Sequence, residues 1–286
     1  MEAAMRKEAE RRRKKRIQPG RVVIYIVLLI GVFTMLFPFI WMLLSSFKSN
    51  IEVIQVPPTF FPANWVLDGY NRAIERNILN PYLNTIIVSI GITFFQLLTA
   101  SMAAYAFARL QFPGQNILFF LVLSMMMVPQ NMTMIPKFHM VRALGGYDKL
   151  IGIIMPNFIS INVTFFIRQN FMSFPTELED AAKIDGCSYV RFFLRILLPL
   201  STAIMTAMGI MVLLWAWNDL LWPTIIISNE ANRTLSMFIA MCKGQYVTDY
   251  GFMMAASSLA VMPMIIVYAI FQRAFVSSIT MTGIKG

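Results

Sequence analysis

Histidine, cysteine and charged residues are all scarce in this chain, and each scarcity excludes a class of chemistry. His139 is the only histidine, so neither a Ser/His/Asp triad nor a histidine-rich metal site can be assembled. No Gly-Lys dipeptide occurs, and a Walker A loop for nucleotide phosphates is therefore absent. We predict no catalytic residue, no metal site and no cofactor bound by this chain, which is not expected to be an enzyme.

The charged fraction is too low for an ordinary soluble domain. Of the 286 residues, 58% are hydrophobic and 13% are charged, about half the charged fraction of a typical soluble protein. Apolar runs of roughly 20 residues predict an all-α integral membrane protein, because a helix satisfies its own backbone hydrogen bonds inside a bilayer.

Six membrane-spanning helices are predicted, at Val22–Leu44, Tyr82–Phe107, Ile117–Pro136, Leu150–Ile167, Pro199–Trp222 and Phe252–Phe271. An even number of spans places both termini on the same side. If that side is the cytoplasm, inner segments hold 16 Lys and Arg residues and outer segments hold 8, the asymmetry that the positive-inside rule describes. Cys187 and Cys242 then lie on opposite sides, and no disulfide is expected.

Residues 1–21 form a basic segment ahead of the membrane domain, residues 22–286. The segment contains nine Lys and Arg residues, which favour a topology signal beside anionic lipid over a nucleic-acid-binding arm. The run Val22–Leu44 is too long for a signal-peptide core and lacks a small-residue cleavage site, so we expect it to remain as the first span.

The stretch Pro175–Pro199 carries four acidic and three basic residues between apolar runs, so it must lie in water. Thr176 and Glu179 have the spacing of a capping box, which predicts the start of a helix. Gly186 is a suitable helix stop, and Ser188 can cap a second helix. We predict a short, capped helix whose small residues allow close docking by another protein.

The spans hold almost no ionisable residue, and Asp219 is the exception. Buried acids and bases carry the ions of coupled transporters, so a proton- or sodium-driven carrier is disfavoured. The chain is expected to take its energy from a partner. A self-contained channel or facilitator stays open as an alternative, although such a protein has no need for the capped helix. A membrane enzyme is the weakest reading.

The charged stretch resembles the Glu-Ala-Ala loop signature of permease subunits in bacterial ATP-binding-cassette importers. The matching positions are Asp180-Ala181-Ala182, Gly186, Ile196, Leu198 and Pro199, with Asp in place of the first Glu. Weaker matches extend nearly end to end, from Pro38-Phe39-Ile40-Trp41 to Gln272-Arg273. Through them the chain resembles the second, six-span permease of maltose-type systems. The tail departs from that pattern, because Ser278 and Thr282 stand where Gly is common.

The resemblance implies a type I importer permease fold in the bacterial cytoplasmic membrane. It implies a heterodimer with a second permease, two ATPase subunits that bind ATP and Mg²⁺, and an extracytoplasmic solute-binding protein. Residues 171–198 would be the cytoplasmic coupling loop. Its predicted coupling residues are Glu177, Glu179, Asp180, Ala181, Ala182, Asp185 and Gly186.

A substrate pathway is predicted from polar and aromatic residues within the spans, because amides and aromatic rings bind sugars. The candidates are Asn84, Gln96, Asn157, Asn162, Trp215 and Asn218. Such residues also hold membrane helices together. The 23 methionines fit packing and lipid contact better than a soft pathway lining.

The predicted spans contain no basic residue, which favours a neutral oligosaccharide as the cargo. Glycerol-phosphate or an acidic sugar stays open.

Overall fold

The computed structural model describes residues 19–242 and 249–281, with side chains up to Gln272. Most of the basic segment lies outside these ranges, as does Thr282, whereas Ser278, the other tail position that departs from the importer pattern, lies within them. Every regular element in the described residues is helical. The predicted all-α class is therefore confirmed for this part of the chain.

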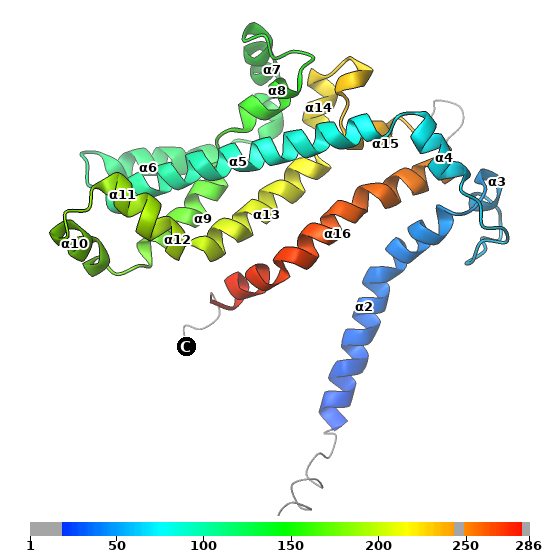
Figure 1. Ribbon diagram of the computed structural model, residues 1–286, viewed down its shortest axis with the longest axis horizontal. Coiled ribbons are helices and arrows are strands. Elements are labelled where there is room, and N and C mark those ends of the chain that lie inside the picture. Colours follow the sequence, from blue (N-terminus) through cyan, green and yellow to red (C-terminus); the bar gives the residue numbers. More distant parts are fainter. Residues whose placement is uncertain (1–18, 243–248, 282–286) are drawn as a thin grey trace, which may run out of the picture.

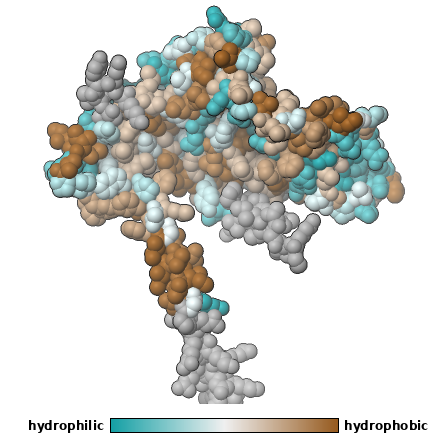
Figure 2. Space-filling view, turned by 180° about the vertical axis from the view of Figure 1, so that it is seen from behind, coloured by the Kyte–Doolittle hydropathy of each residue, from teal (hydrophilic) through white to brown (hydrophobic). Residues whose placement is uncertain are grey.

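Three helices are long and apolar enough to cross a membrane unaided, among the described residues. They are α2 (Pro19–Ser45), α5 (Leu79–Arg109) and α16 (Tyr250–Met281). Each contains one of the predicted spans. The apolar side chains of α2 are exposed along its length, and the helix stands apart from the body of the molecule except near one end, where it contacts α16 (Figures 1 and 2).

The other three predicted spans correspond to bent pairs of helices, and the total reaches six only if each pair counts as one span. The first pair comprises α6 (Gln115–Ser124) with the 3₁₀ turn η1 (Met125–Met127), followed by η2 (Gln130–Thr133) and α7 (Met134–Ala143). The second comprises α8 (Leu150–Ile154) with η3 (Met155–Asn157), followed by α9 (Ile161–Met172). The third comprises α11 (Tyr189–Phe192), the π-helical turn η4 (Phe193–Leu197) and α12 (Leu198–Leu200), followed by α13 (Thr202–Asn218).

The predicted span Ile117–Pro136 is sharply bent, because the helices on either side of the break meet at 95°. Pro129 has no backbone N–H and disfavours helical geometry at the residue before it. Val128 is accordingly extended, with φ −79° and ψ 117°. The second and third pairs bend less, by 45° and 77°.

Helix α5 forms the centre of the bundle, packed against α9 and α13 (Figure 1). Its buried face contributes Val88, Ile92, Ala100 and Ala104 to the main apolar core. Helix α10 (Glu177–Ile184) lies at one end of the molecule, and α3 (Asn50–Val53) and α4 (Asp68–Glu75) lie at the other (Figure 1). The elements α14 (Leu221–Ile226), η5 (Glu230–Asn232) and α15 (Leu235–Ala240) join α13 to the segment before α16.

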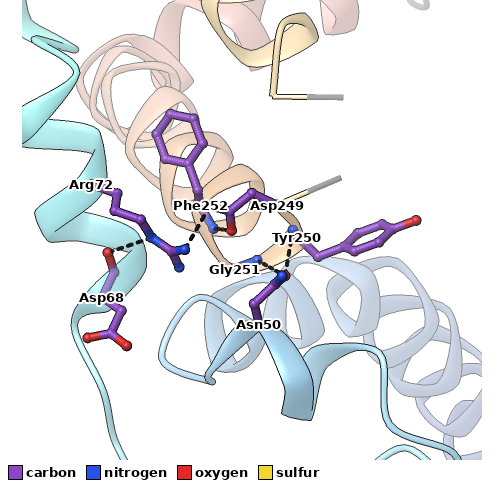
Figure 3. A network of polar contacts seen from close by, with 7 residues as sticks. All are labelled: Asn50, Asp68, Arg72, Asp249, Tyr250, Gly251 and Phe252. Carbon is purple, nitrogen blue, oxygen red and sulfur yellow. Dashed lines mark hydrogen bonds and ion pairs between the residues drawn. The ribbon is translucent and has the colours of Figure 1, made fainter. Parts of the chain in front are cut away.

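A polar network fastens α3 and α4 to the first turn of α16 (Figure 3). Arg72 forms an ion pair of 2.8 Å with Asp249. Asn50 Oδ1 accepts hydrogen bonds from the backbone N–H groups of Tyr250, at 2.9 Å, and Gly251, at 3.4 Å. These two N–H groups belong to the first turn of α16, and N–H groups in a first turn have no acceptor within their own helix. The network therefore caps α16 with a residue about 200 positions away in the sequence.

Gly69 allows α4 to approach this turn closely. A Cβ atom at Gly69 would lie 2.5 Å from the Gly251 carbonyl oxygen and 3.0 Å from the Ala255 Cβ atom. In contrast, a Cβ atom at Gly31, in the exposed helix α2, would meet nothing within 4 Å.

The same substitution at these two glycines should therefore have opposite effects. We expect Gly69→Ala to destabilise the protein by about 1–3 kcal/mol, as overpacking of a tight contact does. Gly31→Ala should be neutral or stabilising by up to about 1 kcal/mol, because Ala favours helix over Gly. Thermal unfolding of the purified membrane protein measures both, and equal effects at the two positions would contradict the close packing of α4 on α16.

Candidate functional site

The charged loop folds as predicted in outline, as a short helix and a tight turn. Helix α10 spans Glu177–Ile184, and Thr176 is its N-cap residue. The predicted capping box is wrong, because the Thr176 side chain makes no cap hydrogen bond. The Glu179 carboxylate lies 3.1 Å from Lys183 Nζ instead. The α10 start is held by backbone bonds from Glu179 and Asp180 to the Thr176 carbonyl, at 2.9 and 3.1 Å.

The end of α10 is a glycine turn, as the sequence predicts. Gly186 has φ +73°, a conformation that side chains with a Cβ atom adopt at a cost. The Gly186 N–H donates to the Lys183 carbonyl at 3.0 Å, and the Cys187 N–H donates to the Ala182 carbonyl at 2.8 Å. This pairing closes the last turn of the helix. Ser188 then accepts from the Arg191 N–H, which confirms its predicted role as the cap of α11.

One face of α10 is fixed against the rest of the chain. Glu179 and Ala182 are each only 7% exposed. Ala182 belongs to the main apolar core. Lys183 lies at the edge of this face, and its hydrogen bond to Glu179 raises the pKa of the lysine. The predicted coupling residues Glu179 and Ala182 therefore face inward, toward the chain's own helices.

The opposite face of α10 is free in the described structure. The predicted coupling residues Glu177, Asp180, Ala181, Asp185 and Gly186 are exposed there. Two apolar residues that the sequence analysis missed accompany them: Leu178 is 41% exposed and Ile184 is 87% exposed. The three-residue spacing of Leu178, Ala181 and Ile184 places them on one helix face, a signal that the sequence did contain.

A cavity of about 420 Å³ lies beside α5, between the bends of the broken spans. Its polar lining residues are Gln96, Gln130, Thr133, Asn157, Ser160 and Asn162. Four methionines and two aromatic residues supply much of the apolar lining: Met125, Met126, Met208, Met211, Phe166 and Trp215. None of the described residues that line it is ionisable. The size falls in the range of small-molecule sites.

Four of the six predicted pathway residues meet in this cavity: Gln96, Asn157, Asn162 and Trp215. Gln130 and Thr133 also line the cavity but are not among the predicted pathway residues. Pro129, which precedes them at the break in the predicted span Ile117–Pro136, was the signal that could have found them. The methionines in the lining were likewise assigned to ordinary packing.

Asn84 and Asn218 do not reach this cavity. The Asn84 amide donates to the carbonyls of Ala231, at 2.8 Å, and Arg233, at 2.9 Å, and so holds the turn before α15. The Asn218 amide donates to the Leu214 carbonyl in its own helix at 2.8 Å. It lines a separate, mostly apolar groove between α13, α15, α16 and α2.

One base contacts a lining residue without itself lining the cavity. Lys137 Nζ donates to Asn157 Oδ1 at 3.2 Å and lies 4.3 Å from the centre of the Trp222 ring. Asn157 also donates to the Ile153 carbonyl at 2.9 Å. The Asn157 amide is therefore held at both ends, with its orientation toward the cavity fixed. In residues 19–242 and 249–281, no group of three or more His, Cys, Asp or Glu side chains could hold a metal ion.

A family comparison places this architecture among known transporters. Residues 96–281 match the family described as binding-protein-dependent transport system inner membrane component. The chain belongs to this family. It is a permease subunit of an ATP-binding-cassette importer, a membrane protein and not an enzyme, as the loop motif predicts.

Individual relatives agree with the family over nearly the whole chain. The arabinooligosaccharides transport system permease protein AraQ of Halalkalibacterium halodurans is 32% identical over 89% of this chain and 92% of its own. The sn-glycerol-3-phosphate transport system permease protein UgpE of Pectobacterium atrosepticum is 29% identical over 88% of this chain and 93% of its own. A crystal structure of a bacterial ABC transporter involved in the import of the acidic polysaccharide alginate contains a chain with the same fold. That chain matches with a TM-score of 0.79 and 21% identity, over 90% of this permease and 96% of the other.

The turn at Gly186 gives a direct test of the loop geometry. A Cβ atom there would meet nothing within 4 Å, so only the backbone conformation opposes substitution. We expect Gly186→Val to open the end of α10, since a left-handed residue with a side chain costs about 1–2 kcal/mol. Gly186→Asn should be milder, because Asn tolerates this conformation. Amide exchange across residues 177–187 measures the difference, and equal protection in both variants would contradict the assigned turn.

Proposed function

We propose that this permease crosses the membrane six times with both termini in the cytoplasm and pairs with a second, different permease. Two ATPase subunits and an extracytoplasmic binding protein complete the importer. The Lys and Arg asymmetry of the connecting segments supports this orientation. Helix α10 then lies on the cytoplasmic side, where ATPase subunits are found, and α3 and α4 lie outside.

The observation that carries the proposal is the division of α10 into two faces. Glu179 and Ala182 fix the helix to its own chain, while Leu178 and Ile184 present apolar side chains to solvent. An exposed apolar patch on a short helix with a closed C-terminal turn favours protein docking over a solvated loop. We assign the docking contact to Leu178, Ala181 and Ile184. The exposed acids Glu177, Asp180 and Asp185 surround it and would steer a basic partner surface.

An aspartate at position 184 should therefore remove the ATPase from the complex. Burial of an isoleucine side chain contributes about 2 kcal/mol, and a buried unpaired carboxylate adds a further penalty. We expect Ile184→Asp to abolish co-purification of the ATPase subunits with the permease pair. Ile51→Asp is the matched control, because Ile51 is 80% exposed on another short helix, α3, at the opposite end. Normal ATPase recovery with Ile184→Asp would refute this docking face.

We propose that the cavity beside α5 passes the cargo, and that the cargo is a neutral oligosaccharide. Six polar residues that carry no charge line the cavity together with Trp215 and Phe166. Amides bind sugar hydroxyl groups, and aromatic faces stack on sugar rings. The relative AraQ is named for the transport of arabinooligosaccharides.

An anionic cargo is the second candidate, and one observation favours it. Lys137 does not line the cavity, but it donates a hydrogen bond to Asn157, which does. UgpE, named for sn-glycerol-3-phosphate, is nearly as similar to this chain as AraQ. Uptake of a neutral arabino-oligosaccharide and of sn-glycerol-3-phosphate by the reconstituted importer distinguishes the two candidates.

Removal of the amide from Gln96 should impair uptake without loss of the complex. We expect Gln96→Leu to raise the cargo concentration for half-maximal uptake by about tenfold, the effect of one hydrogen bond lost in a buried site. Asn218→Leu is the matched control, since that amide bonds to its own helix outside this cavity. Radiolabelled uptake in proteoliposomes measures both. A larger loss with Asn218→Leu than with Gln96→Leu would place the pathway elsewhere.

A further inference from the structure

Two residues of α5 hold the loop that carries α10, one on each side of that helix. Arg109, the last residue of α5, donates from Nη2 to the carbonyls of Phe171 and Phe174, both at 2.7 Å. Phe171 lies in the last turn of α9, and Phe174 lies in the link between α9 and α10. Carbonyls at a helix end lack partners within the helix and favour a cation. Arg109 therefore holds the segment that leads into α10.

The segment that leads out of α10 is held one helical turn earlier on α5. The Tyr105 hydroxyl donates to the Tyr189 carbonyl at 3.3 Å, and Tyr189 is the first residue of α11. The Tyr105 ring is buried and lies 5.1 Å, centre to centre, from the ring of Phe193. Positions four apart share one face of a helix, so Tyr105 and Arg109 hold both ends of the α10 segment from the same side of α5.

The same helix reaches the cavity and the far end of the molecule. Helix α5 is continuous over 31 residues, a length of about 46 Å. Gln96, in the middle of α5, lines the cavity. Near its start, Thr85 Oγ1 accepts from the Leu235 N–H at 2.7 Å, and Asn84 holds the turn before α15. A rigid helix with polar contacts at both ends can carry a displacement along its length.

We propose that Tyr105 and Arg109 are positioning residues that make α10 a rigid extension of α5. A displacement of α10 by the ATPase then moves the Gln96 side of the cavity with it, instead of bending the loop. This inference rests on the proposed docking of the ATPase on α10. It adds the route by which the displacement of α10 reaches the cavity beside α5.

Arg168 provides a matched control for Arg109. It lies on α9, and its Nε donates to the Phe107 carbonyl of α5 at 3.0 Å. Its guanidinium carbon lies 3.9 Å from the centre of the Phe119 ring. Arg168 thus ties α5 to α9 and α6 at the same end of the bundle, but the contacts described for it do not include the residues beside α10.

The test compares variants in the full importer, reconstituted with its second permease, ATPase subunits and loaded binding protein. The readout is the amount of cargo taken up per ATP hydrolysed, at equal amounts of assembled complex. A purely structural role would lower the amount of complex without changing this ratio. We expect Arg109→Gln to lower the ratio by about tenfold, the effect of losing hydrogen bonds from a charged donor.

The milder variants Arg109→Lys and Tyr105→Phe decide the question if Arg109→Gln fails to assemble. Tyr105→Phe removes one hydroxyl and should lower the ratio by about threefold. Arg168→Gln should leave the ratio at the wild-type value. A wild-type ratio in Arg109→Lys and Tyr105→Phe, or an equal fall in Arg168→Gln, would overturn the proposal.

A second measurement separates this inference from the proposed function. Amide exchange of residues 177–187 in the permease complex without nucleotide should be faster in Arg109→Lys and Tyr105→Phe than in Arg168→Gln. Unchanged exchange would overturn the positioning role whether or not uptake is observed. Absence of ATP-driven uptake in the wild-type importer, with the exchange difference present, would instead count against the proposed function.

Discussion

The buried polar side chains of α5 must be satisfied within the bundle, and the rest of the arrangement depends on how this is done. Thr85, Ser89 and Thr93 donate to the carbonyls of Pro81, Thr85 and Ser89, at 2.6–2.8 Å, within their own helix. A polar stripe can therefore run through an apolar core at little cost, because each of these three hydroxyl groups has a hydrogen-bond partner. Gln96 can then sit in the middle of the helix, where the broken spans leave room for a cavity.

The bends in the neighbouring spans create that room. Backbone groups freed by a bend are tolerated at membrane depth only where protein or a water-filled cavity surrounds them. Val128 and Pro129 turn the chain by 95°, and the break between η3 and α9 turns it by 45°. Residues from both breaks line the same cavity, including Gln130 and Asn157. The two breaks thus place the cavity as well as ending the helices.

Much of this arrangement was predictable from sequence because it depends on local chemistry. Apolar runs located α2, α5 and α16, and the need for a left-handed residue located the turn at Gly186. Two features were not predicted. The Glu179 carboxylate pairs with Lys183, four residues on, in place of the expected capping box. The Asn84 amide binds the carbonyls of Ala231 and Arg233, which lie about 150 residues away and leave no mark on the local sequence.

The position of Lys137 limits how this permease can treat a charged cargo. Its ammonium group is already engaged by Asn157, at 3.2 Å, and by the Trp222 ring, at 4.3 Å. A cation over an aromatic ring is stabilised in place, so withdrawal of Lys137 toward a phosphate or carboxylate would break both contacts. The lining itself, in the residues described, carries no ionisable group. An anion in this cavity would therefore need its compensating charge either from Lys137, at the expense of both contacts, or from outside this chain, whereas a neutral sugar finds its amide and aromatic partners already in place.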